Sequence, residues 1–172
     1  MDVDGGGPQR LTTDPGDDVA PSWSSDGRWI YFGSNRGGDH QIWRIPASGG
    51  EAIQVTRNGG IHAQESQDRR FLFYTKTRGI VPLWRAPLAD GVITGPEERI
   101  HEPIFYLSFE VRPEGVYVGS RTSFQLLPAS GGASVLFQTA IGQEISVSAD
   151  RKFVLSNVSA DTSDLMVMDN FR

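Results

Sequence analysis

The sequence contains no cysteine, which excludes a disulfide framework and any metal site built from thiolates. It has no apolar stretch near the roughly 18 residues that suggest a membrane span. Lys and Arg form no basic run, and the net charge is −5, so the electrostatic pattern of a nucleic-acid-binding protein is missing. We therefore expect no membrane insertion and no nucleic-acid partner.

Motifs of catalysis are missing as well. The chain has no Gly-x-Ser-x-Gly elbow, no His-Glu-x-x-His pair and no phosphate-binding glycine loop that opens a helix. We expect no enzyme activity, no catalytic residue and no cofactor. The N-terminal stretch MDVDGGGPQR is acidic and lacks the apolar core of a signal peptide, so no export signal is visible and the compartment stays unknown.

Glycine and proline, in contrast, are plentiful, at 20 and 10 of the 172 residues, which favours many short elements joined by turns. The clearest unit runs from Asp18 to Thr56. It has two apolar runs around the turn Ser25-Asp26-Gly27, a third run at Gln41–Ile45 and a fourth at Ala52–Thr56. These are four predicted strands with no helical periodicity between them.

The unit recurs along the chain. Asp26–Phe32 aligns with Asp68–Tyr74, which lies 42 residues later. The hexapeptide Ile45–Gly50 returns almost unchanged as Leu127–Gly132, two periods further on. Four-stranded repeats of about 40 to 45 residues are typical of β-propeller blades. A β-sandwich is the alternative, but a sandwich does not need the same hexapeptide twice.

We therefore predict an all-β fold, a β-propeller of four-stranded antiparallel blades with about four repeats in a single domain, 1–172. The predicted blades are 14–57, 58–100, 101–139 and 140–172, the last with three strands. Residues 1–13 carry a further outer strand.

The ends of the chain are out of phase with the repeat. Residues 8–12 resemble a fourth strand without its blade, and residues 144–169 supply three strands without a fourth. We expect residues 8–12 to complete that last blade. The chain then closes as a small ring, or is a portion of a longer propeller, or associates with itself.

The residues Ala20–Arg36, followed by Gln41–Trp43, resemble the TolB-like, WD-like propeller repeat of bacteria. The second unit departs from the repeat, with Ala63-Gln64-Glu65 in place of Pro-x-Trp. The closing residues 163–172 resemble the end of propeller sensor domains. The resemblance implies a propeller portion, work outside the cytoplasm and binding within envelope protein complexes.

One blade cannot bury both of its faces, so neighbouring blades must cover them. We therefore expect Trp23, Trp43 and Trp84 to be core residues rather than platforms for a stacked ligand. On this reading, Trp23→Ala costs about 3–5 kcal/mol of stability, as large-to-small core changes do, whereas Arg36→Ala leaves the fold nearly intact.

Arg36, Arg78 and Arg121 each follow the second strand of a unit, where the loops share one face with the connections between blades. Three arginines there could bind an anionic or carboxylate ligand. The alternative, which we favour, is that each pairs with a nearby Asp.

His62 and His101 lie near the first strands of units two and three, and Glu102 follows directly. With Glu144 they could form a metal site. Because Ala20 occupies the equivalent position in unit one, the ligand set is incomplete, and we expect no metal. His62, His101 and Glu102 remain candidate ligand-binding residues.

Two functions fit these observations. The first is a non-catalytic binding or scaffold module that uses a propeller face for a protein, a peptide or a small polar ligand, as the sensing end of a larger regulatory protein. The second is an accessory propeller that gates substrate to a prolyl-oligopeptidase-like hydrolase domain outside this chain.

Overall fold

The computed structural model describes residues 7–120, 123–138, 144–159 and 163–169, with backbone only for 138, 157–159 and 163–169. Sixteen strands and no helix are present in these ranges, and the strands within each sheet pair antiparallel. A helix that could cross a membrane is therefore not found in the described part of the chain. The predicted all-β fold is confirmed.

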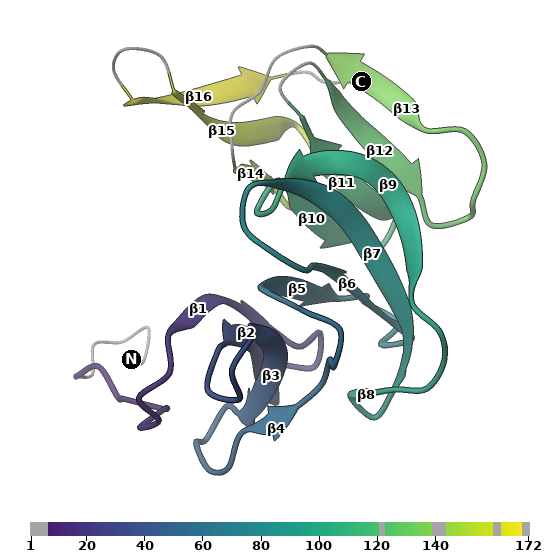
Figure 1. Cartoon of the computed structure of the whole chain (residues 1–172). Helices are drawn as coiled ribbons and strands as arrows, with labels where there is room; N and C mark the ends of the chain where they lie inside the picture. The colour runs from purple at the N-terminus through teal and green to yellow at the C-terminus, as the bar shows by residue number, and fades with distance from the viewer. Residues whose placement is uncertain (1–6, 121–122, 139–143, 160–162, 170–172) are drawn as a thin grey trace.

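The strands form four successive sheets along an open arc, from the N-terminal sheet at the bottom of Figure 1 to the C-terminal sheet at its top. The first sheet has the order β1-β2-β3-β4. Its strands are β1 (Asp18–Trp23), β2 (Trp29–Ser34), β3 (Gln41–Pro46) and β4 (Ile53–Gln54).

The second sheet contains five strands. They are β5 (His62–Glu65), β6 (Phe71–Thr75), β7 (Ile80–Ala89), β8 (Val92–Ile93) and β9 (Glu98–Phe105). The long strand β7 pairs with β8 at one end and with β9 along the rest of its length.

The third and fourth sheets follow the same pattern. The third is β10 (Phe109–Arg112), β11 (Gly115–Gly119), β12 (Phe124–Pro128) and β13 (Val135–Gln138). The fourth is β14 (Ile145–Val147), β15 (Phe153–Ser159) and β16 (Ser163–Asp169). These are the blades of the propeller.

Two details of the strand arrangement differ from the sequence predictions. Residues 101–105, expected to open the third blade, are instead the end of β9 and belong to the second sheet. The reason is the length of β7, which leaves an unpaired edge that β9 fills. In addition, residues 7–13 form no strand and do not complete the last blade. Leu11 lies against the β3–β4 turn of the first sheet, so this segment belongs to the opposite end of the arc.

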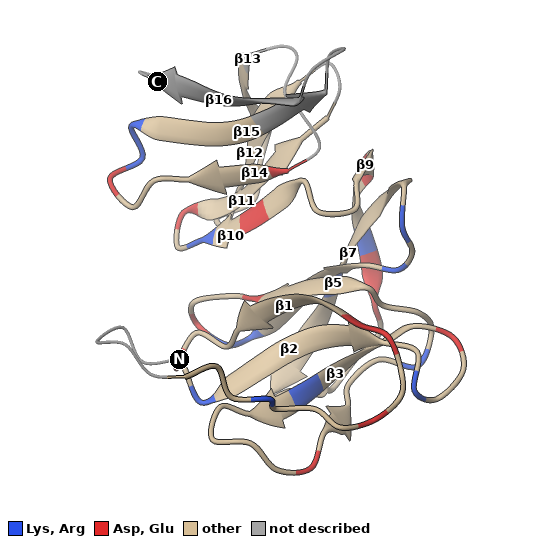
Figure 2. Cartoon of the chain, turned by 90° about the vertical axis from the view of Figure 1, so that its left-hand side faces the viewer, with Lys and Arg blue, Asp and Glu red and all other residues tan. Residues whose placement is uncertain are grey.

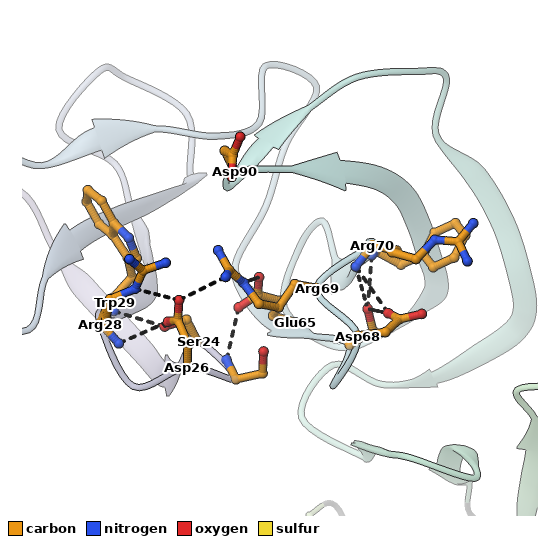
Figure 3. A network of polar contacts seen from close by, with 12 residues as sticks. Ser24, Asp26, Arg28, Trp29, Glu65, Asp68, Arg69, Arg70 and Asp90 are labelled. Atoms are coloured by element: carbon orange, nitrogen blue, oxygen red, sulfur yellow. Dashed lines mark hydrogen bonds and ion pairs between the residues drawn. The ribbon is translucent and has the colours of Figure 1, made fainter.

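A recurrent serine–aspartate turn joins the first two strands of three blades. In the first blade, Ser24 Oγ donates to Asp26 and accepts from the Trp29 backbone N–H, and Asp26 accepts from the Arg28 N–H. Figure 3 shows this network and the corresponding one around Asp68. The hydrogen bond from Ser24 is the main reason why the pKa of Asp26 lies far below its usual value.

The core lies between the blades. Because side chains alternate along a strand, each central strand sends one set to the preceding blade and one set to the next. Tyr31 and Ile42 pack against Leu72 and Tyr74 between blades one and two. Equivalent clusters lie between blades two and three and between blades three and four.

Polar side chains on the innermost strands also connect successive blades. Ser22, Gln64 and Glu110 occupy the same position in three blades. Each bonds to the backbone of the next blade, with partners Ala63, then Phe109 and Val111, then Val147. The blades are therefore stabilised as one body by these bonds as well as by apolar packing.

Trp23 is not a core residue, contrary to the prediction. Its side chain is 62% exposed, whereas the aligned Glu65, Val111 and Val147 are 6%, 8% and 2% exposed. Those three positions face a preceding blade, and the described chain places none in front of β1. Trp43 and Trp84 are half-buried.

Candidate binding face

Loops from the first two blades meet around a cleft of about 680 Å³ on one face of the arc. They are the β2–β3, β4–β5 and β6–β7 loops, together with the residue before β1. We call this cleft the loop-face cleft. Its charged and titratable lining residues are Asp17, Asp39, His40, Arg57, Lys76 and Arg78.

The loops around the cleft are held by specific hydrogen bonds. Gln41 Oε1 accepts from Thr56 Oγ1 and from the Gly59 backbone N–H, each at 3.0 Å. Asn35 Oδ1 accepts from the Asp17 backbone N–H at 2.7 Å. Gly59 has φ +93°, a left-handed conformation that favours glycine. The cleft is therefore largely formed before any ligand arrives.

The electrostatics of the cleft are mixed, with a small excess of positive charge: its lining has three cationic and two anionic side chains, while the whole chain carries −5. Figure 2 shows basic residues (Lys and Arg) and acidic residues (Asp and Glu) together on the loops of the first two sheets. Arg78 pairs with Asp17 at 3.1 Å, and both side chains are 56% exposed.

Lys76 lies deeper than Arg78. Its ammonium sits 3.8 Å from the centre of the Trp84 ring and pairs with Glu97, which also accepts from the Tyr74 hydroxyl. Partial burial alone would raise the pKa of Glu97, but the bonds from Lys76 and Tyr74 lower it below its usual value. Lys76 is thus a structural cation.

Arg57 is the cation of the cleft that stays available. It is exposed and makes no hydrogen bond or ion pair within the described residues. A guanidinium has five N–H donors in a planar fork that matches a carboxylate. Together with Arg78, whose pair with Asp17 is exposed and weak, it places two guanidinium groups at the cleft.

Arg36 does not belong to this binding surface. Its side chain is only 12% exposed, bonds to both carboxylate oxygens of Asp18 at 3.0 and 3.1 Å, and stacks over Phe32 and Trp43. The favoured alternative, pairing with a nearby Asp, is what the structure shows, and it makes Arg36 a structural residue.

We therefore expect Arg36→Ala to lower the free energy of unfolding by about 1–3 kcal/mol, because it leaves Asp18 without its charged partner. This corrects the sequence-based expectation of a nearly neutral change. Arg78→Ala, the same substitution at the aligned exposed position, should stay within about 0.5 kcal/mol. Urea unfolding of both variants checks this, and equal effects would contradict the distinction.

His62 is buried rather than exposed to a ligand. It is 8% exposed, lies 4.8 Å from the Phe109 ring, and its Nδ1 is 3.5 Å from the Ala20 carbonyl oxygen. Burial lowers the pKa of His62 to about 4, so the ring is neutral at pH 7. It is a core histidine between blades.

His101 and Glu102 lie apart from the cleft, on the outer strand β9. His101 Nε2 contacts the Gln125 amide at 2.7 Å, and Glu102 pairs with Arg99 at 2.6 Å. Arg121 lies outside the described residues. No group of three or more His, Asp or Glu side chains that could hold a metal ion is found among the residues that the structure describes.

Comparisons with known proteins agree with this architecture. Residues 1–86, half of the chain, match the model of the TolB beta propeller domain. The chain belongs to the TolB beta-propeller family. An uncharacterised protein of Agrobacterium fabrum, Atu1656, is 46% identical over 56 residues, which are 33% of this chain and 19% of that protein.

Solved structures show the same fold. TolB from Acinetobacter baumannii superposes with a TM-score of 0.68 at 18% identity, over 87% of this chain and 40% of TolB. XC5397 of Xanthomonas campestris, described as a gluconolactonase, superposes with a TM-score of 0.67 at 16% identity, over 89% of this chain and 57% of XC5397. This TolB-type chain therefore spans 40% of one of these proteins and 57% of the other. At such identities the likeness concerns the fold alone.

The sequence predicted Arg78 as a binding residue, and in this TolB-type propeller Arg78 lines the loop-face cleft, but Arg57 and Asp17 were not predicted. Asp17 directly precedes β1, and Arg57 lies in the β4–β5 loop, three residues after the end of β4. A search for charged residues at the connections between blades, as well as after second strands, would have found Arg57. The sequence alone gave no sign that Lys76 is held by Glu97, which lies 21 residues away.

Proposed function

We propose that this chain is a non-catalytic binding module that uses the loop-face cleft to hold an acidic segment of a partner protein or peptide. The observation that carries the proposal is the exposed guanidinium of Arg57, without a partner in the described structure, beside the weakly paired Arg78. Two guanidinium groups can each form a bidentate pair with a carboxylate of an extended chain.

The shape and rigidity of the cleft support this function. Its volume of about 680 Å³ accommodates several residues of an extended peptide, and its loops are already ordered by Gln41 and Asn35. A preformed site avoids part of the ordering cost of binding. The lining has no paired nucleophile and base, which supports a site that binds without reacting.

The test uses charge reversal with a matched control. The probe is a fluorescently labelled peptide of alternating Glu and Gly, measured by anisotropy. Wild type should bind it, and Arg57→Glu with Arg78→Glu should weaken binding by about tenfold or more, equivalent to about 1.4 kcal/mol. Arg99→Glu, at an exposed arginine on β9, makes the same charge change as Arg57→Glu alone, away from the cleft, and should bind like wild type.

Salt gives a second criterion, because exposed charges interact over only about 8–10 Å at physiological ionic strength. Wild-type affinity should fall as salt rises, while the doubly reversed variant should show little dependence. An absence of binding by wild type, or equal loss in the Arg99→Glu control, would refute the proposed site.

A further inference from the structure

The contact between two blades opens into a wedge at the end of the sheets that carries the serine–aspartate turns, opposite the loop-face cleft. Arg44, Gly91 and Leu88 occupy the wedge between blades one and two, whereas the one between blades two and three is a cavity of about 410 Å³. We call them the first wedge and the second wedge. Because the repeats align, the residues that fill the first wedge show which groups could fill the second.

The first wedge is filled by its own chain. Arg44 lies with its guanidinium 4.2 Å from the centre of the Trp29 ring and donates from Nη1 to the Asp90 carbonyl oxygen at 2.8 Å. Gly91, beside Asp90 in the β7–β8 turn, approaches Arg44 so closely that a Cβ there would overlap it. Leu88 completes the filling as a member of the apolar cluster. Figure 3 shows Trp29 and Asp90 at this site.

The second wedge keeps the cation and the ring but lacks the filling. Arg85 aligns with Arg44, and its guanidinium lies 4.6 Å from the centre of the Phe71 ring, which aligns with Trp29. Its Nε and Nη2 donate to Glu98. Its Nη1, the atom that Arg44 uses for Asp90, has no partner within the described residues.

The residue that would fill the second wedge is alanine. Ala129 aligns with Leu88, since each donates its backbone N–H to the carbonyl oxygen of the residue directly before its blade's second strand. Leu88 donates to Arg70 at 2.7 Å and Ala129 donates to Glu114 at 2.8 Å. The shorter side chain leaves Phe71, Ile100 and Leu127 as partly exposed apolar walls.

We propose that the second wedge binds a small molecule with a flat apolar body and a carbonyl or carboxylate oxygen. The body takes the place of Leu88 between the apolar walls, and the oxygen takes the place of the Asp90 carbonyl at Arg85 Nη1. A volume of about 410 Å³ lies within the roughly 300–1,000 Å³ of small-molecule sites, which combine apolar walls with few polar groups. This site is separate from the loop-face cleft, so either can fail alone.

The experiment restores the missing side chain. Ala129→Leu should fill the cavity, keep or raise the melting temperature, and weaken binding of 2-naphthoate at least about tenfold in isothermal titration. Ala47→Leu makes the same change at the aligned position of the first blade, away from the wedge, and should bind like wild type. Because the filled variant stays folded, its loss of binding does not reflect unfolding.

The oxygen requirement is tested separately. 2-Naphthamide should bind wild type like 2-naphthoate, whereas 2-methylnaphthalene, which lacks the oxygen, should bind at least about tenfold more weakly. Arg85→Met should remove that preference. Naphthoate binding that Ala129→Leu leaves unchanged, no saturable binding by wild type, or a wedge that only associates with a second protein chain would each overturn the proposal.

Discussion

Leu72→Ala is expected to lower the free energy of unfolding by about 2–5 kcal/mol, the usual cost of removing a fully buried leucine side chain. Leu72 is 0% exposed and packs among Tyr31, Ile42 and Tyr74 between the first two blades. Its loss would leave a cavity at the interface that stabilises both blades. Urea unfolding followed by tryptophan fluorescence measures the change.

Trp23→Ala is the control for this prediction. Although it removes a larger side chain, Trp23 is 62% exposed, and surface substitutions usually change stability by no more than about 0.5 kcal/mol. If Trp23→Ala proved as costly as Leu72→Ala, Trp23 would be covered in solution, by residues outside the described part of the chain or by another molecule.

Stability should also fall in mild acid, because His62 is buried in neutral form. Its pKa in the folded protein is about 4, against about 6.5 in an unfolded chain. Between these values the unfolded chain binds the extra proton, so stability is complete above about pH 6.5 and is lost as the pH falls toward 4. At about 1.4 kcal/mol per pH unit, the loss is about 3 kcal/mol.

The measurement compares free energies of unfolding at about pH 7.5 and 4.5, and carboxylates of the unfolded chain also begin to take up protons near the lower value. His62→Gln removes the titrating ring, so the difference between wild type and variant isolates its contribution. The pH dependence of the variant should be smaller by about 2–3 kcal/mol. An equal pH dependence of the free energy of unfolding in both proteins would show that His62 is protonated without loss of stability.

Much of the fold could be predicted from the sequence because its signals are local. The run Ser24-Ser25-Asp26-Gly27 encodes a turn through its own hydrogen bonds, and alternation within each strand encodes two packed faces. The repeat then identifies the propeller. None of these features needs knowledge of a distant residue.

The predictions for Trp23 and Arg36 were wrong because the contacts of these side chains depend on residues that are distant in the sequence. Trp23 occupies a position that is buried elsewhere in the chain, but its exposure depends on whether another blade precedes it. Arg36 and Arg78 follow equivalent strands, yet Arg36 meets the partly buried Asp18 and Arg78 meets the exposed Asp17. The repeat pattern that predicts both arginines on one face does not indicate which side chain stays exposed to a ligand.

The central claim is that recognition occurs at the loop-face cleft. Amide chemical-shift mapping during titration with the Glu–Gly peptide tests it most directly. We predict that the largest shifts occur in the β2–β3, β4–β5 and β6–β7 loops, with Gly59 and Arg57 among them. Shifts concentrated at the serine–aspartate turns on the opposite side, or shifts absent at saturating peptide, would contradict the account.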